Sequence, residues 1–194
     1  MTVIVPPQSV HRAGIPLSPE VDRESATEVE YFERVEFFKG DVWLWGRVVR
    51  SHGRRLSDVL NHTTAGLLLH EAVVDGSSGA SGSIAGRDTW IDLREIDLIG
   101  HTAIERAASR EGRPINEHVV KRPQHLTVWT ASHEIRGYVH LYAEADLESF
   151  LRSDDPPLIA MTDAEVSWVT PGRTARRFPF VLLNRRRIFA TRAD

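Results

Sequence analysis

The most informative stretch of this chain is residues 34–49, which read RVEFFKGDVWLWGRVV. Apolar residues recur with strand-like spacing on both sides of Lys39-Gly40-Asp41, which is a typical turn sequence. The stretch therefore predicts a β-hairpin. Gly46 lies inside its second strand, where a missing Cβ favours a bend, a bulge or a close approach of another backbone.

The same pattern returns 91 residues later in residues 125–140, which read HLTVWTASHEIRGYVH. The shift places Gly46 on Gly137. A short amphipathic helix is expected after each hairpin, and the shift aligns its apolar residues: Leu56, Val59 and Leu60 with Leu147, Phe150 and Leu151. The hairpin and the helix therefore recur together.

Strand-like runs follow the first of these helices at 67–74, 90–93 and 96–99. One inserted residue aligns Ala72 with Ala164, and a small deletion farther on aligns Leu93 with Leu183. Coincident helix, glycine and strands over about 65 residues predict an internal duplication. We expect a mainly β (α+β) protein of two tandem small β-barrels, each with the order β-β-α-β-β-β.

Composition suggests where these units begin and end. Residues 1–32 lack any strand or helix period and predict a flexible N-terminal arm. The first barrel is expected at 33–101 and the second at 124–194. Between them, residues 102–123 begin with the capping box Thr102-Ala103-Ile104-Glu105, which predicts a short helix followed by a linker.

The overall composition limits the class of protein. The chain has 194 residues and no cysteine, so disulfides and thiolate zinc sites are excluded. It has no signal-peptide pattern and no run of about 18 apolar residues, so we expect a cytoplasmic protein without a membrane span. The net charge is −3, yet residues 171–194 carry seven arginines against one aspartate.

These arginines are the candidate binding residues. We expect a hairpin to bring six guanidinium groups to one end of the second barrel, where they suit phosphate or carboxylate groups: Arg173, Arg176, Arg177, Arg185, Arg186 and Arg187. With nearby aromatic residues such as Trp129 and Phe178, they predict either a surface for single-stranded nucleic acid or contacts with the acidic residues 20–33.

No catalytic or cofactor-binding pattern stands out. The nine histidines do not pair at i, i+4 on a helix, as a metal site often requires. The serines and glycines of residues 77–83 match neither a G-x-S-x-G nucleophile motif nor a phosphate-binding P-loop. We therefore predict no enzyme activity, no cofactor and no metal.

Three segments resemble the Sm-like family of small SH3-like barrels. They are the hairpin ending Gly46-Arg47-Val48-Val49, the strand with Glu71-Ala72-Val73-Val74, and the pair Trp90–Leu93 and Ile96–Ile99. The resemblance covers both copies in outline and implies the barrel fold and RNA binding. The segment RLSDVLN at 55–61 is also similar to uncharacterised bacterial domains.

The chain departs from the Sm-like motifs at their RNA-binding positions. The family has an acidic residue followed four positions later by an asparagine, whereas Asn61 follows Asp58 by three, and the second copy has Arg152 in that place. The family's basic-glycine pair is replaced by Arg94-Glu95 and Asn184-Arg185. The RNA-binding asparagine of the family is therefore absent from the second copy.

We expect a non-catalytic binding or assembly module that acts through protein–protein contacts or self-association, by open strand edges or the N-terminal arm. The alternative is an RNA-binding protein that uses the C-terminal arginines. An enzyme is the third and least favoured class.

Overall fold

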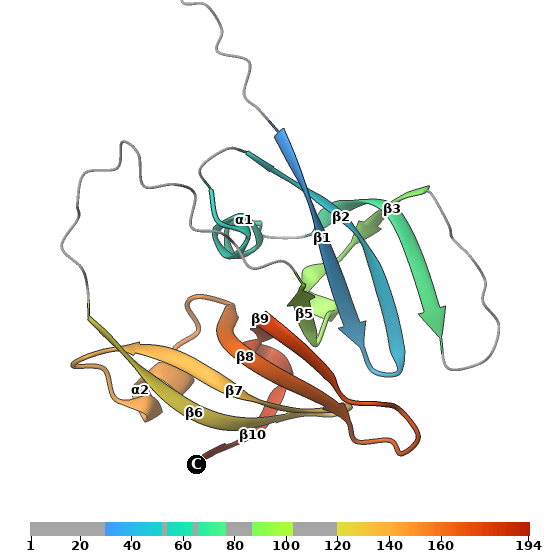
Figure 1. Ribbon diagram of the computed structural model, residues 1–194. Coiled ribbons are helices and arrows are strands. Elements are labelled where there is room, and N and C mark those ends of the chain that lie inside the picture. The colour runs from blue at the N-terminus through green and yellow to red at the C-terminus, as the bar shows by residue number, and fades with distance from the viewer. Residues whose placement is uncertain (1–29, 52–53, 64–65, 77–86, 103–119) are drawn as a thin grey trace, which may run out of the picture.

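The computed structural model describes residues 30–51, 54–63, 66–76, 87–102 and 120–194. Within these residues the chain forms ten strands, two short α-helices and two 3-10 turns (Figure 1). The fold is mainly β, as the sequence predicts.

The two halves of the chain have the same order of elements. The first half contains β1 (Glu30–Lys39), β2 (Val42–Ser51), α1 (Leu56–His62), β3 (Leu67–Gly76), β4 (Arg87–Ile91), the 3-10 turn η1 (Leu93–Glu95) and β5 (Leu98–His101). The second contains β6 (Lys121–Thr130), β7 (His133–Tyr142), α2 (Leu147–Arg152), β8 (Leu158–Trp168), β9 (Arg176–Asn184), η2 (Arg185–Arg187) and β10 (Ile188–Ala193).

Two strands begin earlier than predicted. β1 starts at Glu30, so residues 30–32 of the expected arm are strand, and β6 starts at Lys121 inside the expected linker. The rest of the arm, residues 1–29, lies outside the described residues. The expected linker helix falls almost wholly within 103–119, which also lies outside them.

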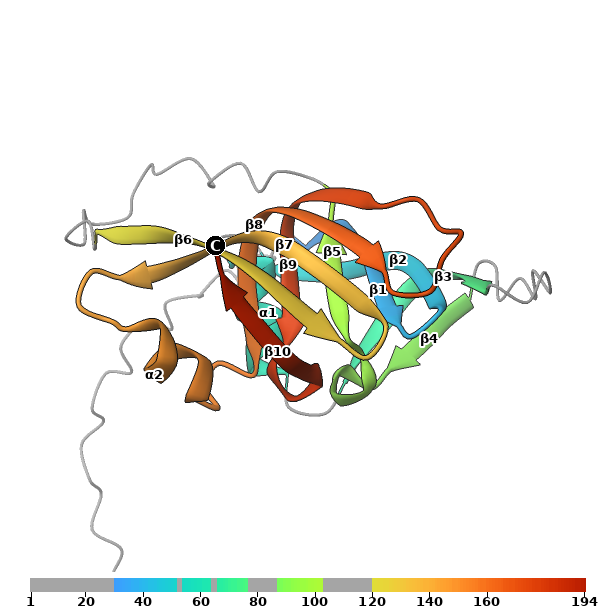
Figure 2. The same ribbon diagram turned by 90° about the horizontal axis from the view of Figure 1, so that it is seen from below.

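The ten strands form one antiparallel sheet in the order β10-β6-β7-β8-β9-β5-β1-β2-β3-β4. The prediction of two separately closed barrels is therefore not confirmed, because the sheet is open at β10 and at β4. The physical reason is that β5 pairs with β1 on one side and with β9 of the other half on its second side. The halves stay side by side without interleaving (Figures 1 and 2).

The strand registers of the two halves also coincide. Val35 faces His101 across β1 and β5, and Leu126 faces Ala193 across β6 and β10. Adding 91 to the residue numbers of β1 and 92 to those of β5 converts all four pairs between β1 and β5 into four pairs between β6 and β10. The structural repeat therefore extends to individual residue pairs.

The shift of 92 continues to the end of the chain, so the predicted small deletion is wrong. Asp92 caps η1 by accepting a hydrogen bond from the amide of Arg94, and Asn184 caps η2 through the amide of Arg186. Leu93 thus corresponds to Arg185 and not to Leu183. An apolar residue has been exchanged for a polar one at this turn, and a comparison of apolar positions cannot detect that.

Gly46 and Gly137 occupy equivalent positions for a backbone reason. Opposite each glycine the facing strand contains a register shift, with Glu71 at φ 52° and Asp163 at φ 49°. An added Cβ would lie 2.8 Å (Gly46) or 2.9 Å (Gly137) from a carbonyl oxygen of that strand. Of the three alternatives that the sequence leaves open for a glycine here, a close backbone approach is therefore found at both sites, together with a register shift in the facing strand.

Two buried apolar clusters stabilise the sheet, and each takes residues from both halves. The cluster of the first half includes Leu158 and Leu182 of the second half. The cluster of the second half includes Phe38 and Leu98 of the first. All four side chains are at most 5% exposed, so their burial stabilises the junction as well as each half.

Candidate functional site

The structure does not bring the six predicted arginines together. β9 runs from Arg176 to Asn184, so Arg173, Arg176 and Arg177 lie at its start and Arg185–Arg187 follow its end. At about 3.3 Å per residue, a strand of this length separates the two groups by roughly 30 Å. The expected hairpin contact between them is wrong because the whole strand lies between them.

Arg176 instead joins the two halves. Its guanidinium group lies 2.9 Å from the carboxylate of Glu36 on β1 and 4.3 Å from the ring centre of Trp43. Glu36 is only 2% exposed. Burial raises the pKa of this carboxyl group, and the positive charges of Arg176 and Arg34 oppose that rise. The pair joins a buried carboxylate to a partly exposed guanidinium group and links β9 to β1.

Asn184 and Arg187 connect the two 3-10 turns. The side-chain amide of Asn184 donates to the carbonyl oxygens of Leu93 and Arg94, each at 3.2 Å, and of Ile96 at 2.9 Å. Arg187 lies 2.9 Å from the Glu95 carboxylate and donates to the Arg94 carbonyl oxygen, also at 2.9 Å. The end of β9 is thus bound to η1 of the other half.

Arg185 and Arg173 have local partners. Arg185 donates to the carbonyl oxygens of Phe150 at 2.5 Å and Pro156 at 2.9 Å, and burial lowers its pKa. Arg173 lies 5.3 Å from the ring centre of Trp168. Most of the predicted arginines therefore make contacts within the chain.

Arg177 and Arg186 are the exposed members of the predicted set. The Arg177 side chain is 86% exposed and pairs with Glu165 at 2.8 Å. Arg186 is exposed, and its backbone amide donates to Asn184. These two residues are the ones placed to meet a ligand directly.

Backbone pairing between β5 and β9 forms the centre of the junction. Four facing pairs join these strands: Leu98 with Leu183, Ile99 with Leu182, Gly100 with Val181, and His101 with Phe180. Asn61 of α1 adds a bidentate contact, because its side chain accepts from the amide of Leu158 at 2.9 Å and donates to the carbonyl oxygen of the same residue at 3.4 Å. Asn61 therefore has a structural contact at the position that the Sm-like resemblance associates with RNA.

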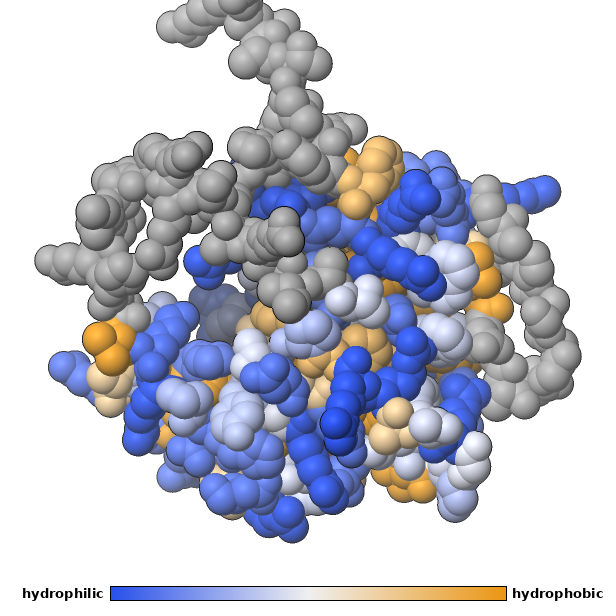
Figure 3. Space-filling model, viewed as in Figure 1, coloured by the Kyte–Doolittle hydropathy of each residue, from blue (hydrophilic) through white to orange (hydrophobic). Residues whose placement is uncertain are grey.

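The two ends of the sheet are open. Among the described strands, none pairs with the outer side of β4 or of β10. Trp90 of β4 is 64% exposed and Phe189 of β10 is 71% exposed. On the face shown in Figure 3, apolar residues lie in several separate groups among hydrophilic ones. The edge strands thus combine unpaired backbone groups with large exposed side chains.

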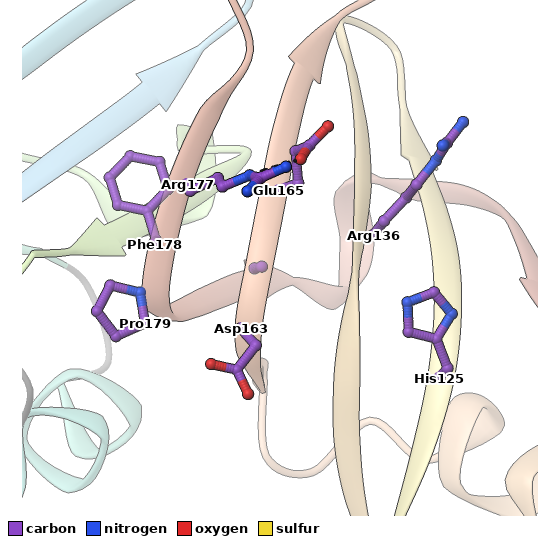
Figure 4. Close-up of a pocket in the computed structure, with 8 residues that line it drawn as sticks. His125, Arg136, Asp163, Glu165, Arg177, Phe178 and Pro179 are labelled. Carbon is purple, nitrogen blue, oxygen red and sulfur yellow. Dashed lines mark hydrogen bonds and ion pairs between the residues drawn. The ribbon is translucent and has the colours of Figure 1, made fainter.

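Residues of β6–β9 line a pocket (Figure 4). It is lined by His125, Arg136, Asp163, Ala164, Glu165, Arg177, Phe178 and Pro179. Arg177 pairs with Glu165 at 2.8 Å, and His125 lies 2.8 Å from Asp194. The lining contains two arginines and two carboxylates, so the pocket lacks the excess positive charge that a polyanion site requires.

The described residues contain no metal site of ordinary composition. No group of three or more of their histidine, aspartate and glutamate side chains could hold an ion. Two buried histidines lie beside carboxylates of this chain. His101 lies 3.2 Å from Glu33, and His133 lies 3.6 Å from Asp97. Burial lowers the pKa of His133 in spite of the nearby carboxylate.

The two described α-helices have 7 and 6 residues, and neither could span a membrane.

Sequence reasoning missed three residues of the junction and its edges. Glu36 lies between apolar neighbours and has the appearance of an outward-facing strand residue. Asn184 and Trp90 become informative only after the repeat is aligned with a shift of 92, which places Asn184 on Asp92 and Trp90 on Leu182. That alignment is the signal in the sequence that could have identified them.

Comparisons with protein-family models, with curated proteins and with solved structures found no match for this chain.

Proposed function

We propose that the protein is a non-catalytic assembly module that docks onto protein partners through the edge strands β4 and β10. One observation carries the proposal. Among the described residues no strand pairs with the outer side of β4 or of β10, and these two strands contain Trp90, which is 64% exposed, and Phe189, which is 71% exposed. An edge strand offers a row of backbone N–H and C=O groups to which an added strand can pair.

We further propose that each half is a small Sm-like or SH3-like unit whose sheet is strongly bent. The glycine–bulge contact at Gly46 and at Gly137 supports this, because a bulge bends a strand and increases its twist. The two buried clusters, one for each half, support it as well.

The contacts of the arginines favour protein docking over nucleic-acid binding. Arg176, Arg185 and Arg187 already bind carboxylate or carbonyl groups of this chain. The exposed Arg177 pairs with Glu165. A nucleic-acid surface needs cations that are free to neutralise phosphates.

The test is co-purification of a tagged chain from cells, with and without nuclease. The edge variant is Trp90→Lys with Thr191→Lys, because charged side chains on an edge strand oppose strand addition. The matched control is Val169→Lys with Thr170→Lys, which adds the same charge at exposed positions of the β8–β9 loop.

We expect wild type and control to retain the same protein partner, or further copies of the chain, after nuclease treatment, and the edge variant to lose it. Retention that disappears with nuclease would show nucleic-acid binding instead. Equal retention by the edge variant would contradict the role of β4 and β10.

A further inference from the structure

We infer that the partner of these edges is a second copy of the chain, joined head to tail by pairing β10 of one copy with β4 of the next. The inference rests on the proposed function and names its partner. Its basis is the junction inside the chain, where β5 of one half pairs with β9 of the other. β10 and β4 are the counterparts of those same two strands.

The repeat specifies the register of this pairing. A shift of 92 residues relates β5 to β10, and it also relates β4 to the last residues of β9. Applied to the four pairs of the internal junction, it predicts four pairs between chains. They are Ala190 with Ile91, Thr191 with Trp90, Arg192 with Thr89, and Ala193 with Asp88, the second residue of each pair belonging to the next copy.

Apolar side chains are uncovered where the second copy would lie. Leu182, which is 1% exposed, belongs to the same buried cluster as Leu56 of α1, which is fully buried. Their counterparts at the open ends are Trp90, 64% exposed, and Leu147 of α2, which is half-buried. Head-to-tail pairing brings Trp90 of the next copy to this face of α2 and buries both.

Charges at the new junction are complementary. Inside the chain, Arg187 pairs with Glu95, and these two residues occupy equivalent positions of the two halves. In the junction between chains, the same shift places Arg187 of one copy beside Glu95 of the next, and each of the two also keeps its partner within its own chain. Opposite charges therefore meet at this point.

One residue makes the junction between chains weaker than the internal one. Asn184 donates to three carbonyl oxygens across the internal junction. Its counterpart Asp92 is a carboxylate, which accepts from Arg94 and has no N–H group to donate. Association of copies is therefore reversible, whereas the halves of one chain stay together. Because the contact is head to tail, copies close into a ring or extend as a filament.

Cysteine cross-linking tests the register directly, because the natural chain has no cysteine. Facing residues of antiparallel strands have Cα atoms about 4.5–5.5 Å apart, within the range of a disulfide. Mixtures of single variants, Thr89→Cys with Arg192→Cys and Asp88→Cys with Ala193→Cys, should form disulfide-linked dimers. The crossed mixtures, Thr89→Cys with Ala193→Cys and Asp88→Cys with Arg192→Cys, should not, because adjacent strand residues point to opposite faces.

We expect the in-register mixtures to give at least about ten times more mixed dimer than the crossed mixtures, since disulfide geometry is strict. Dimers formed by one variant with itself would show a symmetric contact and overturn the inference. A purified chain that light scattering shows to be monomeric at high concentration, with no cross-linking, would also overturn it. The co-purification result decides the proposed function separately.

A second variant tests the equivalence of the two junctions. Asp92→Asn recreates the side chain of Asn184 and should lower the dissociation constant between copies about five-fold, the effect of one recovered hydrogen bond. Asp88→Asn is the control, since it removes the same charge from the same edge without recreating a donor of the internal junction. A dissociation constant that Asp92→Asn leaves unchanged would overturn the equivalence.

Discussion

Glu36 and Arg176 form the contact that most depends on the two halves being together. They are 140 residues apart in the chain, and the carboxylate of Glu36 is almost completely removed from water. A buried carboxylate is tolerated when a cation and hydrogen bonds compensate its lost hydration. Arg176 provides both, and the ring of Trp43 covers its other side.

Replacing Arg176 with Met should lower the free energy of unfolding by about 2–4 kcal/mol, because it removes the closest cation of the buried Glu36 carboxylate and leaves the charge of Arg34 to compensate its lost hydration. Urea denaturation measures the change. Arg177→Met is the control: its exposed ion pair with Glu165 should contribute less than about 1 kcal/mol. Equal effects of the two substitutions would show that the Glu36–Arg176 pair contributes no more to the free energy of unfolding than an exposed ion pair does.

The sequence could not predict this pair. Glu36 alternates with Val35 and Phe37 as a solvent-facing strand residue does, and Arg176 lies in a run of basic residues that favours a binding surface. Whether Glu36 is buried depends on what packs against its side of the sheet, and its cation Arg176 comes from β9 of the other half. Local patterns do not contain this information.

The elements themselves were largely predictable. The hairpins, the short helices and the order of strands follow from local periodicity and from the turn at Gly40, all of which act over a few residues. The pairing of β5 with β9 was not predictable, because an apolar strand of this kind fits equally well against either half. This pairing is one difference between the closed barrels that we expected and the open sheet that forms.

Gly46→Ala and Gly137→Ala should each lower the free energy of unfolding by about 1–3 kcal/mol, because the added Cβ meets a backbone carbonyl oxygen that cannot move without straining the bulge. Thermal and urea denaturation measure the effect. The adjacent substitutions Arg47→Ala and Arg136→Ala, at exposed positions, are the matched controls. Wild-type stability in either glycine variant would contradict the close backbone approach.

At the scale of the whole molecule, the exchange of apolar residues between clusters couples the halves. Leu182 contributes to the cluster of the first half, and Leu98 contributes to that of the second. Neither cluster is complete within its own half. We therefore expect one cooperative unfolding transition instead of two.

The tryptophans provide a probe for each half: Trp45 and Trp90 in the first, Trp129 and Trp168 in the second. Trp43 packs against the cluster of the second half and is replaced by Phe throughout. Replacing those of one half by Phe isolates the fluorescence of the other. Leu182→Ala should destabilise by about 2–5 kcal/mol and lower the urea midpoint reported by the first half as much as that reported by the second. Val169→Ala, at an exposed position, is the control. Separate midpoints for the two halves would contradict coupled unfolding.

The difference between Asn184 and Asp92 has a consequence for chain connectivity. A circular permutant that begins at residue 120, with its old ends joined by a linker, would enclose the Asp92 contact and present the Asn184 contact to its neighbours. Both halves would still belong to one molecule, so covalent order and contact strength would favour different junctions within it. The oligomeric state of the permutant would then report which of the two decides the intramolecular contact.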